Sequence, residues 1–204
     1  MNYKDYQNSR DLAWRLLLDM QIRELPISTV SVCRQLGVPV KLYNALDGED
    51  GYTAYVGDGP VIFVRAGVYA PRQRFTTAHE LGHILAGHVG KHSLVNREPS
   101  SADNPIEQEA NVFASRLLAP ACVLWGCGVK TAEDIQQLCQ ISRQASEYRM
   151  ARMQVLYERD RFLTSPLERA VYEQFDAYIE SHKISPRNPA EAQSSCGVPP
   201  SVRR

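Results

Sequence analysis

The sequence predicts an α+β fold, in which a small, mainly antiparallel sheet of about three strands packs on a long helix and a helical C-terminal half follows. Three short β-rich runs lie between residues 38 and 65, and the last two flank the turn Gly57-Asp58-Gly59. That pattern is typical of a β-hairpin. From residue 74 onward, apolar residues recur mostly at helical spacing. Strands followed by helices indicate an α+β chain.

The N-terminal part is expected to hold two helices before the sheet. The first, over residues 10–22, is predicted from Leu12, Leu16 and Met20, which repeat every four residues. The second runs over residues 29–36 and ends at Gly37. We expect strands over 38–43, 51–56 and 60–65, then a loop over 66–73. A second loop is expected over 89–105.

The C-terminal half is expected to contain a helix-turn-helix-like pair, over residues 131–139 and 143–157. Five arginines and five acidic residues balance each other in this region. A nucleic-acid-binding surface needs a basic excess, so we expect protein docking there, with Tyr148 and Arg149 as anchors, and no direct binding of DNA. A further helix is predicted to start at Ser165.

These patterns divide the chain into an N-terminal domain over residues 1–122, a helical helix-turn-helix-like region over 123–184 and a tail over 185–204. The tail is rich in Pro and Ser, which predicts disorder. The formal net charge of the whole chain is zero and 44% of its residues are hydrophobic. These values favour a globular protein over a membrane binder. Five cysteines without a C-x-x-C pair are expected to be reduced thiols, and the N-terminus has no signal-peptide pattern, so we expect a cytoplasmic protein.

The residues that carry chemistry are His79-Glu80-Leu81-Gly82-His83, a match to H-E-x-x-H. On a helix, positions i and i+4 lie on one face, so His79 and His83 can bind one metal ion. Glu80 is offset from that row and can take a proton from water as a general base. Zinc suits such a site because it lowers the pKa of bound water to about 7 without redox chemistry.

A catalytic zinc needs a third protein ligand. The metzincin pattern would place a histidine at position 89, which is Val89. The next helical stretch, residues 105–120, offers Glu109 at the end of an apolar stripe formed with Phe113 and Leu117. A carboxylate on such a face is costly unless it binds a metal or a partner. We therefore expect Glu109 as the third ligand, and Glu107 stays open as the alternative.

Two blocks of this sequence together resemble the ImmA/IrrE family of zinc metallopeptidases. They are Phe-Thr-Thr-Ala-His-Glu-Leu-Gly-His at 75–83 and Glu-Ala-Asn-Val-Phe-Ala-x-x-Leu-Leu-Ala-Pro at 109–120. The resemblance implies zinc ligands at His79, His83 and Glu109, a catalytic base at Glu80, and the helix-turn-helix-like segment. It also implies a protein substrate, a helix-turn-helix transcriptional repressor cut in response to stress or to induction of a mobile element.

Two functions from different classes follow. The first is a zinc-dependent endopeptidase, which also needs a group that stabilises the oxyanion; His88 and Tyr69 are the candidates. The second is a non-catalytic regulatory module that binds a repressor or DNA. The intact set of His79, Glu80, His83 and an acidic ligand favours the enzyme, because a pure binding module has no need of a general base.

Overall fold

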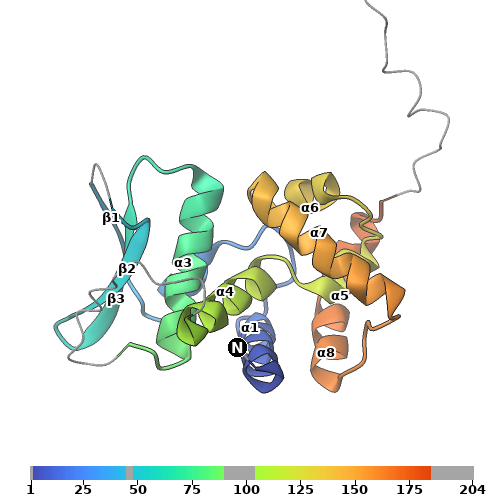
Figure 1. Cartoon of the computed structure of the whole chain (residues 1–204), viewed down its shortest axis with the longest axis horizontal. Coiled ribbons are helices and arrows are strands. Elements are labelled where there is room, and N and C mark those ends of the chain that lie inside the picture. The colour runs from blue at the N-terminus through green and yellow to red at the C-terminus, as the bar shows by residue number, and fades with distance from the viewer. Residues whose placement is uncertain (1, 45–47, 90–103, 185–204) are drawn as a thin grey trace, which may run out of the picture.

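A computed structural model describes residues 2–44, 48–89 and 104–184. The expected tail and nearly all of the expected loop over 89–105 lie outside these residues. The described chain forms an α+β fold, with the sheet at one end of the molecule and a cluster of helices at the other (Figure 1). The predicted fold class is therefore confirmed.

The sheet has three strands: β1 (Val40–Tyr43), β2 (Gly51–Val56) and β3 (Gly59–Arg65). Their order is β1-β3-β2; β2 pairs with β3 antiparallel through the predicted hairpin, and β1 pairs with β3 parallel. The sheet is therefore mixed. β3 lies in the middle, and both β1 and β2 are edge strands.

Two helices precede the sheet. Helix α1 (Tyr3–Asp19) begins well before the predicted start, because the side chain of Asn2 caps it by accepting from the backbone N–H groups of Lys4 and Asp5. Helix α2 (Thr29–Gln35) matches its prediction and is capped by Ser28.

The H-E-x-x-H motif lies on α3 (Ala70–Leu85), which packs on β2, β3 and α4 (Pro105–Leu118). Helix α3 starts inside the segment expected to be a loop, because Pro71 occupies its first turn, where a missing N–H is tolerated. The helices cross where Phe113 packs against Gly82. A Cβ at Gly82 would lie 2.8 Å from Cδ1 of Phe113, so this crossing requires glycine.

The C-terminal half consists of α5 (Ala121–Gly126), α6 (Ala132–Cys139), α7 (Arg143–Glu158), α8 (Pro166–Gln174) and α9 (Asp176–Ser181). Helices α6 and α7 form the expected pair. The predicted capping box between Thr131 and Asp134 starts α6, and Ser165 caps α8. The helix predicted from Ser165 is split in two at Phe175.

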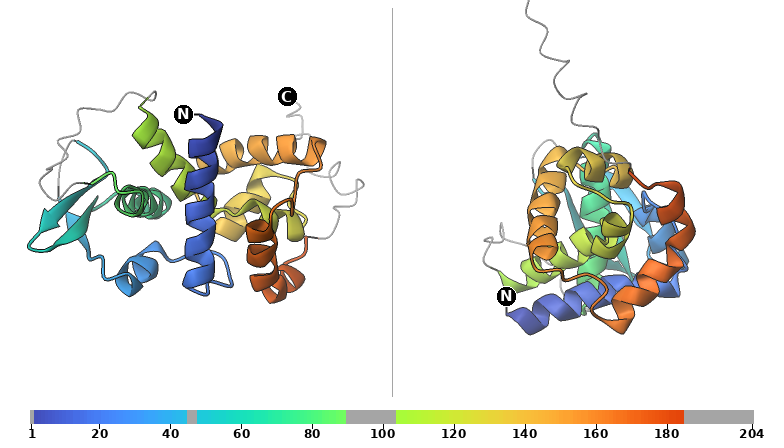
Figure 2. Two further views of the ribbon diagram at one scale, coloured as in Figure 1. Left: turned by 90° about the horizontal axis from the view of Figure 1, so that it is seen from below. Right: turned by 90° about the vertical axis from the view of Figure 1, so that its right-hand side faces the viewer.

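Helix α1 lies between the α3–sheet unit and the C-terminal helices, as two views agree (Figures 1 and 2). The side-chain amide of Gln174 on α8 donates to the carbonyls of Leu17 and Ile22, at 2.8 and 2.7 Å. Most of the buried apolar residues form one continuous cluster from α1 to α9. No helix among the described residues is both long and apolar enough to cross a membrane.

Candidate metal centre and cleft

Three side chains from α3 and α4 converge on one point. Nε2 of His83 lies 3.0 Å from Nε2 of His79. The carboxylate of Glu107 reaches both rings, with Oε2 3.1 Å from Nε2 of His79 and Oε1 3.5 Å from Nε2 of His83. The three residues offer donor atoms that all lie within 4.8 Å of one another, so they could hold a metal ion.

The geometry of this group fits a metal. Ligand atoms about 2.0–2.1 Å from a tetrahedral ion are about 3.3 Å from each other. The two Nε2 atoms are 3.0 Å apart, and the two oxygens of Glu107 lie 3.1 Å from one ring and 3.5 Å from the other, all near that value. Two imidazoles and a carboxylate are also a donor set found at catalytic zinc sites. The H-E-x-x-H pair therefore meets a third ligand of the expected chemical type.

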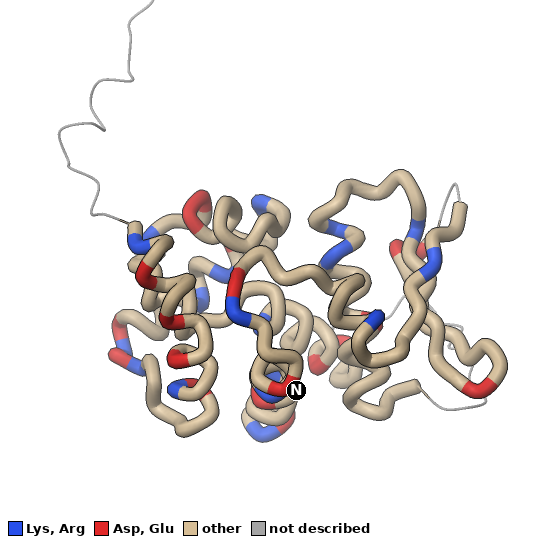
Figure 3. Tube along the Cα trace, turned by 180° about the vertical axis from the view of Figure 1, so that it is seen from behind, with Lys and Arg blue, Asp and Glu red and all other residues tan. Residues whose placement is uncertain are grey.

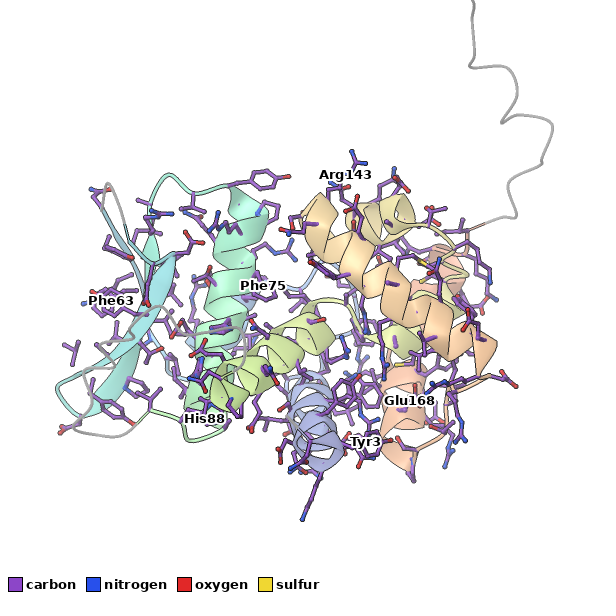
Figure 4. The ribbon with its side chains drawn as sticks, viewed as in Figure 1. Tyr3, Phe63, Phe75, His88, Arg143 and Glu168 are labelled. Atoms are coloured by element: carbon purple, nitrogen blue, oxygen red, sulfur yellow. The ribbon has the colours of Figure 1, made fainter. Side chains whose placement is uncertain are left out.

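The third member of the group is Glu107, the alternative, and not Glu109, the preferred candidate. Glu109 reaches His88 instead, with Oε2 3.2 Å from Nε2 of the ring. His88 lies just past the end of α3, beside the first turns of α4 (Figure 4). The structure thus favours Glu107 over Glu109 as a ligand.

The reason lies in two rows of residues on α4. The row of Phe113 and Leu117 faces the core, and both residues are fully buried. The row of Glu107, Asn111 and Ser115 lines a cleft on the surface. An apolar stripe identifies the core row, whereas a catalytic metal must be open to substrate and therefore needs a ligand from the cleft row.

A second layer of polar groups holds the two imidazoles. Nδ1 of His79 lies 3.0 Å from Oδ1 of Asn111, one turn after Glu107 on α4. Nδ1 of His83 lies 3.1 Å from Nδ1 of His88, whose other nitrogen contacts Glu109. Such contacts fix ring orientation and leave each Nε2 directed at the metal position. Sequence reasoning missed Asn111, although its i, i+4 spacing from Glu107 was visible.

Glu80, the expected general base, is buried and accepts a hydrogen bond from the hydroxyl of Thr53 on β2, at 2.8 Å. Thr53 is 27 positions away in the chain, and no motif links it to Glu80. Its role depends on the packing of α3 against β2, so no sequence signal could have identified it.

The cleft has a volume of about 1390 Å³ and runs from the start of β2 past the metal group to α7. Its lining includes His79, Glu80 and Glu107. Of the two oxyanion candidates, Tyr69 is exposed and lines the cleft. His88 contacts the nitrogen of His83 that faces away from the metal position and does not line the cleft.

The two expected docking anchors on α7 differ in exposure. Tyr148 is exposed and lines the cleft. Arg149 is only 3% exposed and donates from Nε to the carbonyl of Ala119 at 2.8 Å, so it is not a surface anchor. Figure 3 shows basic and acidic residues interspersed along the described trace, and Arg143 and Glu147 on α7 form an ion pair at 2.9 Å.

A small sheet backing an H-E-x-x-H helix, with a carboxylate from the next helix and a cleft beside them, defines a protein of the metallopeptidase type. The sequence model of the family Peptidase_M78, described as the IrrE N-terminal-like domain, matches residues 33–151. The match covers more than half of the 204 residues, and the chain belongs to this family. It includes all three residues of the metal group and Glu80. No curated protein matches the chain.

Proposed function

We propose that this protein is a zinc-dependent endopeptidase that cuts a protein substrate, a helix-turn-helix transcriptional repressor. The observation that carries the proposal is the convergence of His79, His83 and Glu107 at a cleft that also contains Glu80. Membership of a peptidase family supports the reaction class. The repressor as substrate rests on the resemblance to ImmA/IrrE peptidases.

His79, His83 and Glu107 would hold the zinc, which supplies Lewis acidity for the scissile carbonyl and lowers the pKa of water. Glu80 then accepts a proton from the attacking water and gives it to the leaving amine. The Thr53 hydroxyl donates to Oε2 of Glu80 and so orients the carboxylate that exchanges this proton. A base fixed in this way loses little entropy on reaching the reactive geometry.

The substrate in this proposal binds as an extended segment. Strand β2 is an edge strand, and the residues at its start, Asp50 and Gly51, line the cleft. An edge strand can add one more strand through main-chain hydrogen bonds. Tyr148 lies on the opposite side of the cleft, on α7, as an exposed aromatic of the kind enriched at protein contacts.

The test is cleavage of purified helix-turn-helix repressors, beginning with any encoded beside the gene for this chain. We expect one metal-dependent cut by the wild-type protein. The Glu80→Gln variant keeps the shape of the side chain but cannot accept the proton, so cleavage should fall about 100- to 10,000-fold. Its zinc content and thermal unfolding should match those of the wild-type protein.

Two outcomes would contradict the proposal. Wild-type cleavage by Glu80→Gln would refute the role of the base. Stable binding of a repressor or of promoter DNA, without cleavage at any zinc concentration, would support the regulatory-module alternative. In the DNA case the affinity should also fall steeply with added salt.

A further inference from the structure

A second cavity, of about 670 Å³, lies between α1, α4, α7 and the start of α8. It is lined by six arginines: Arg10, Arg116, Arg149, Arg152, Arg159 and Arg161. Tyr3 on α1 and Glu168 on α8 belong to its lining and are labelled in Figure 4. The cavity shares Tyr3, Tyr6, Arg116, Arg149 and Arg152 with the metal cleft, so the two spaces adjoin.

The positive charge of this cavity is poorly compensated. Arg10 pairs with Asp11, but none of the ion pairs among the described residues involves the other five arginines. Glu168 is the acidic residue of the lining, and its Oε2 accepts from the backbone N–H of Thr164 at 2.9 Å. Arg116 and Arg149 are buried, and buried charges are normally paired, so their lack of an acidic partner needs a reason.

Tyr6 lies among the three innermost arginines. Its hydroxyl accepts from Nε and Nη2 of Arg116, at 3.2 and 2.9 Å. The guanidinium groups of Arg116 and Arg152 also lie over its ring, at 5.4 and 5.5 Å from the centroid. A neutral phenol therefore stands where a counter-ion would be expected.

Hydrogen-bond donors without a partner also belong to residues of this lining. Among the described residues, five buried side-chain atoms have no hydrogen-bond partner, and three of them belong to residues that line this cavity. They are Nε1 of Trp14, Nη2 of Arg149 and Nε of Arg152. All three are donors, and Arg149 and Trp14 are almost fully buried. The lining thus has unpaired donors and, with six arginines against Glu168, an excess of positive charge.

The protonation tendencies agree with this picture. Burial, and then the nearby charge of Arg116, hold the pKa of Arg149 well below its usual value. Burial would raise the pKa of the Tyr6 hydroxyl, but Arg116, Arg152 and Arg149 lower it overall. The lowered pKa of Tyr6 reflects the positive charge around it, and Arg116 adds to the effect of burial at Arg149.

We propose that this cavity is a binding site for a small molecule that carries a phosphate or polyphosphate group. Guanidinium groups bind phosphate oxygens through paired, charge-assisted hydrogen bonds. A cavity of about 670 Å³ is larger than a single phosphate requires, which favours a polyphosphate group or a phosphate ester. Because Arg116 and Arg149 line both spaces, the bound anion lies against the wall of the metal cleft.

The test is isothermal titration of the full-length, metal-free protein with inorganic phosphate, pyrophosphate and ADP at constant ionic strength. Metal-free protein separates this site from the metal group and from peptidase activity. We expect saturable binding of pyrophosphate. Arg152→Gln and, separately, the exposed Arg159→Gln should weaken it about tenfold or more, the usual effect of losing a charged hydrogen bond. Arg15→Gln removes an equal charge from the exposed face of α1, outside both cavities, and should change nothing.

Tighter binding of ADP than of pyrophosphate would support the site and identify a nucleotide-like ligand. Equal binding of ADP and pyrophosphate would also support the site, and would indicate that a free polyphosphate is the ligand. Absence of saturable binding by all three probes would overturn the proposal. So would equal losses in the Arg15→Gln and Arg152→Gln variants, because that result indicates general charge attraction. Melting curves without ligand check that each variant is folded. If Arg152→Gln does not fold, the binding of pyrophosphate by Arg159→Gln tests the proposal.

Discussion

The hydroxyl of Thr53 on β2 donates to the carboxylate of Glu80 on α3 across 2.8 Å. Both side chains are buried, so the bond is shielded from competing water. This hydrogen bond joins the edge strand β2 to Glu80, the expected general base of the H-E-x-x-H motif. The orientation of Glu80 is thus fixed by the packing of α3 on the sheet.

Replacing Thr53 with valine keeps the shape of the side chain and removes the hydroxyl. We expect peptidase activity to fall about tenfold, because a hydrogen bond to a charged group contributes about 1.5–3 kcal/mol and part of that orients the base. Zinc content should not change. The matched control is Thr29→Val, since Thr29 is equally buried and its hydroxyl has no hydrogen-bond partner. Equal activity in the two variants would refute an orienting role for Thr53.

The choice between Glu107 and Glu109 is decided by zinc affinity, measured by competition with a chelator. Glu107→Gln should weaken zinc binding by more than about 100-fold, because it removes an anionic ligand. Glu109→Gln acts only through His88 and should cost about 10- to 100-fold, the usual effect of an outer-layer group. The exposed Glu133→Gln on α6 is the charge-matched control. The reverse order of the first two variants would restore Glu109 as the ligand.

The crossing of α3 and α4 should not tolerate a side chain at Gly82. In Gly82→Ala the added Cβ would overlap the ring of Phe113, and overpacking of this kind costs about 1–3 kcal/mol. The melting temperature should fall by several degrees. Zinc affinity should fall as well, because the histidines and Glu107 lie on the two helices that are pushed apart. In Gly59→Ala the added Cβ meets nothing within 4 Å, so both properties should be retained. Unchanged zinc affinity in Gly82→Ala would show that the crossing does not position the ligands.

The buried cysteines should not react in the folded protein. Cys33, Cys122, Cys127 and Cys139 are all free and buried. Burial raises the pKa of the Cys122 and Cys139 thiols to about 12 and that of Cys127 to about 11. Only the thiolate reacts, and at pH 8 its fraction at a pKa of 12 is about 1 in 10,000.

The measurement is labelling by a chromogenic disulfide in the Cys196→Ser variant, which retains four of the five cysteines. We expect almost no reaction in native buffer and four equivalents in denaturant. Raising the pH from 8 to 9 should increase the small native rate about tenfold, because both values lie below the raised pKa values. Rapid native labelling of one equivalent or more would contradict the burial of these thiols.

Local patterns in the sequence determined much of this protein. The i, i+4 spacing of His79 and His83, the Gly-Asp-Gly hairpin and the capping residues Thr131 and Ser165 each act within a few positions of the chain. The structure bears out the elements they predict, because hydrogen bonds over short sequence distances need no knowledge of the fold.

Only the tertiary structure decided which residues from separate elements meet. Glu107 and Glu109 differ by two positions, about 200° around α4, and the crossing with α3 determined which one faces His79 and His83. Thr53 reaches Glu80 only because β2 packs beside α3. Of the five arginines that acidic residues balance in the sequence, four line one cavity, whose acidic residue is Glu168. A count of residues along the chain does not say which way their side chains point, because the packing of the elements decides that.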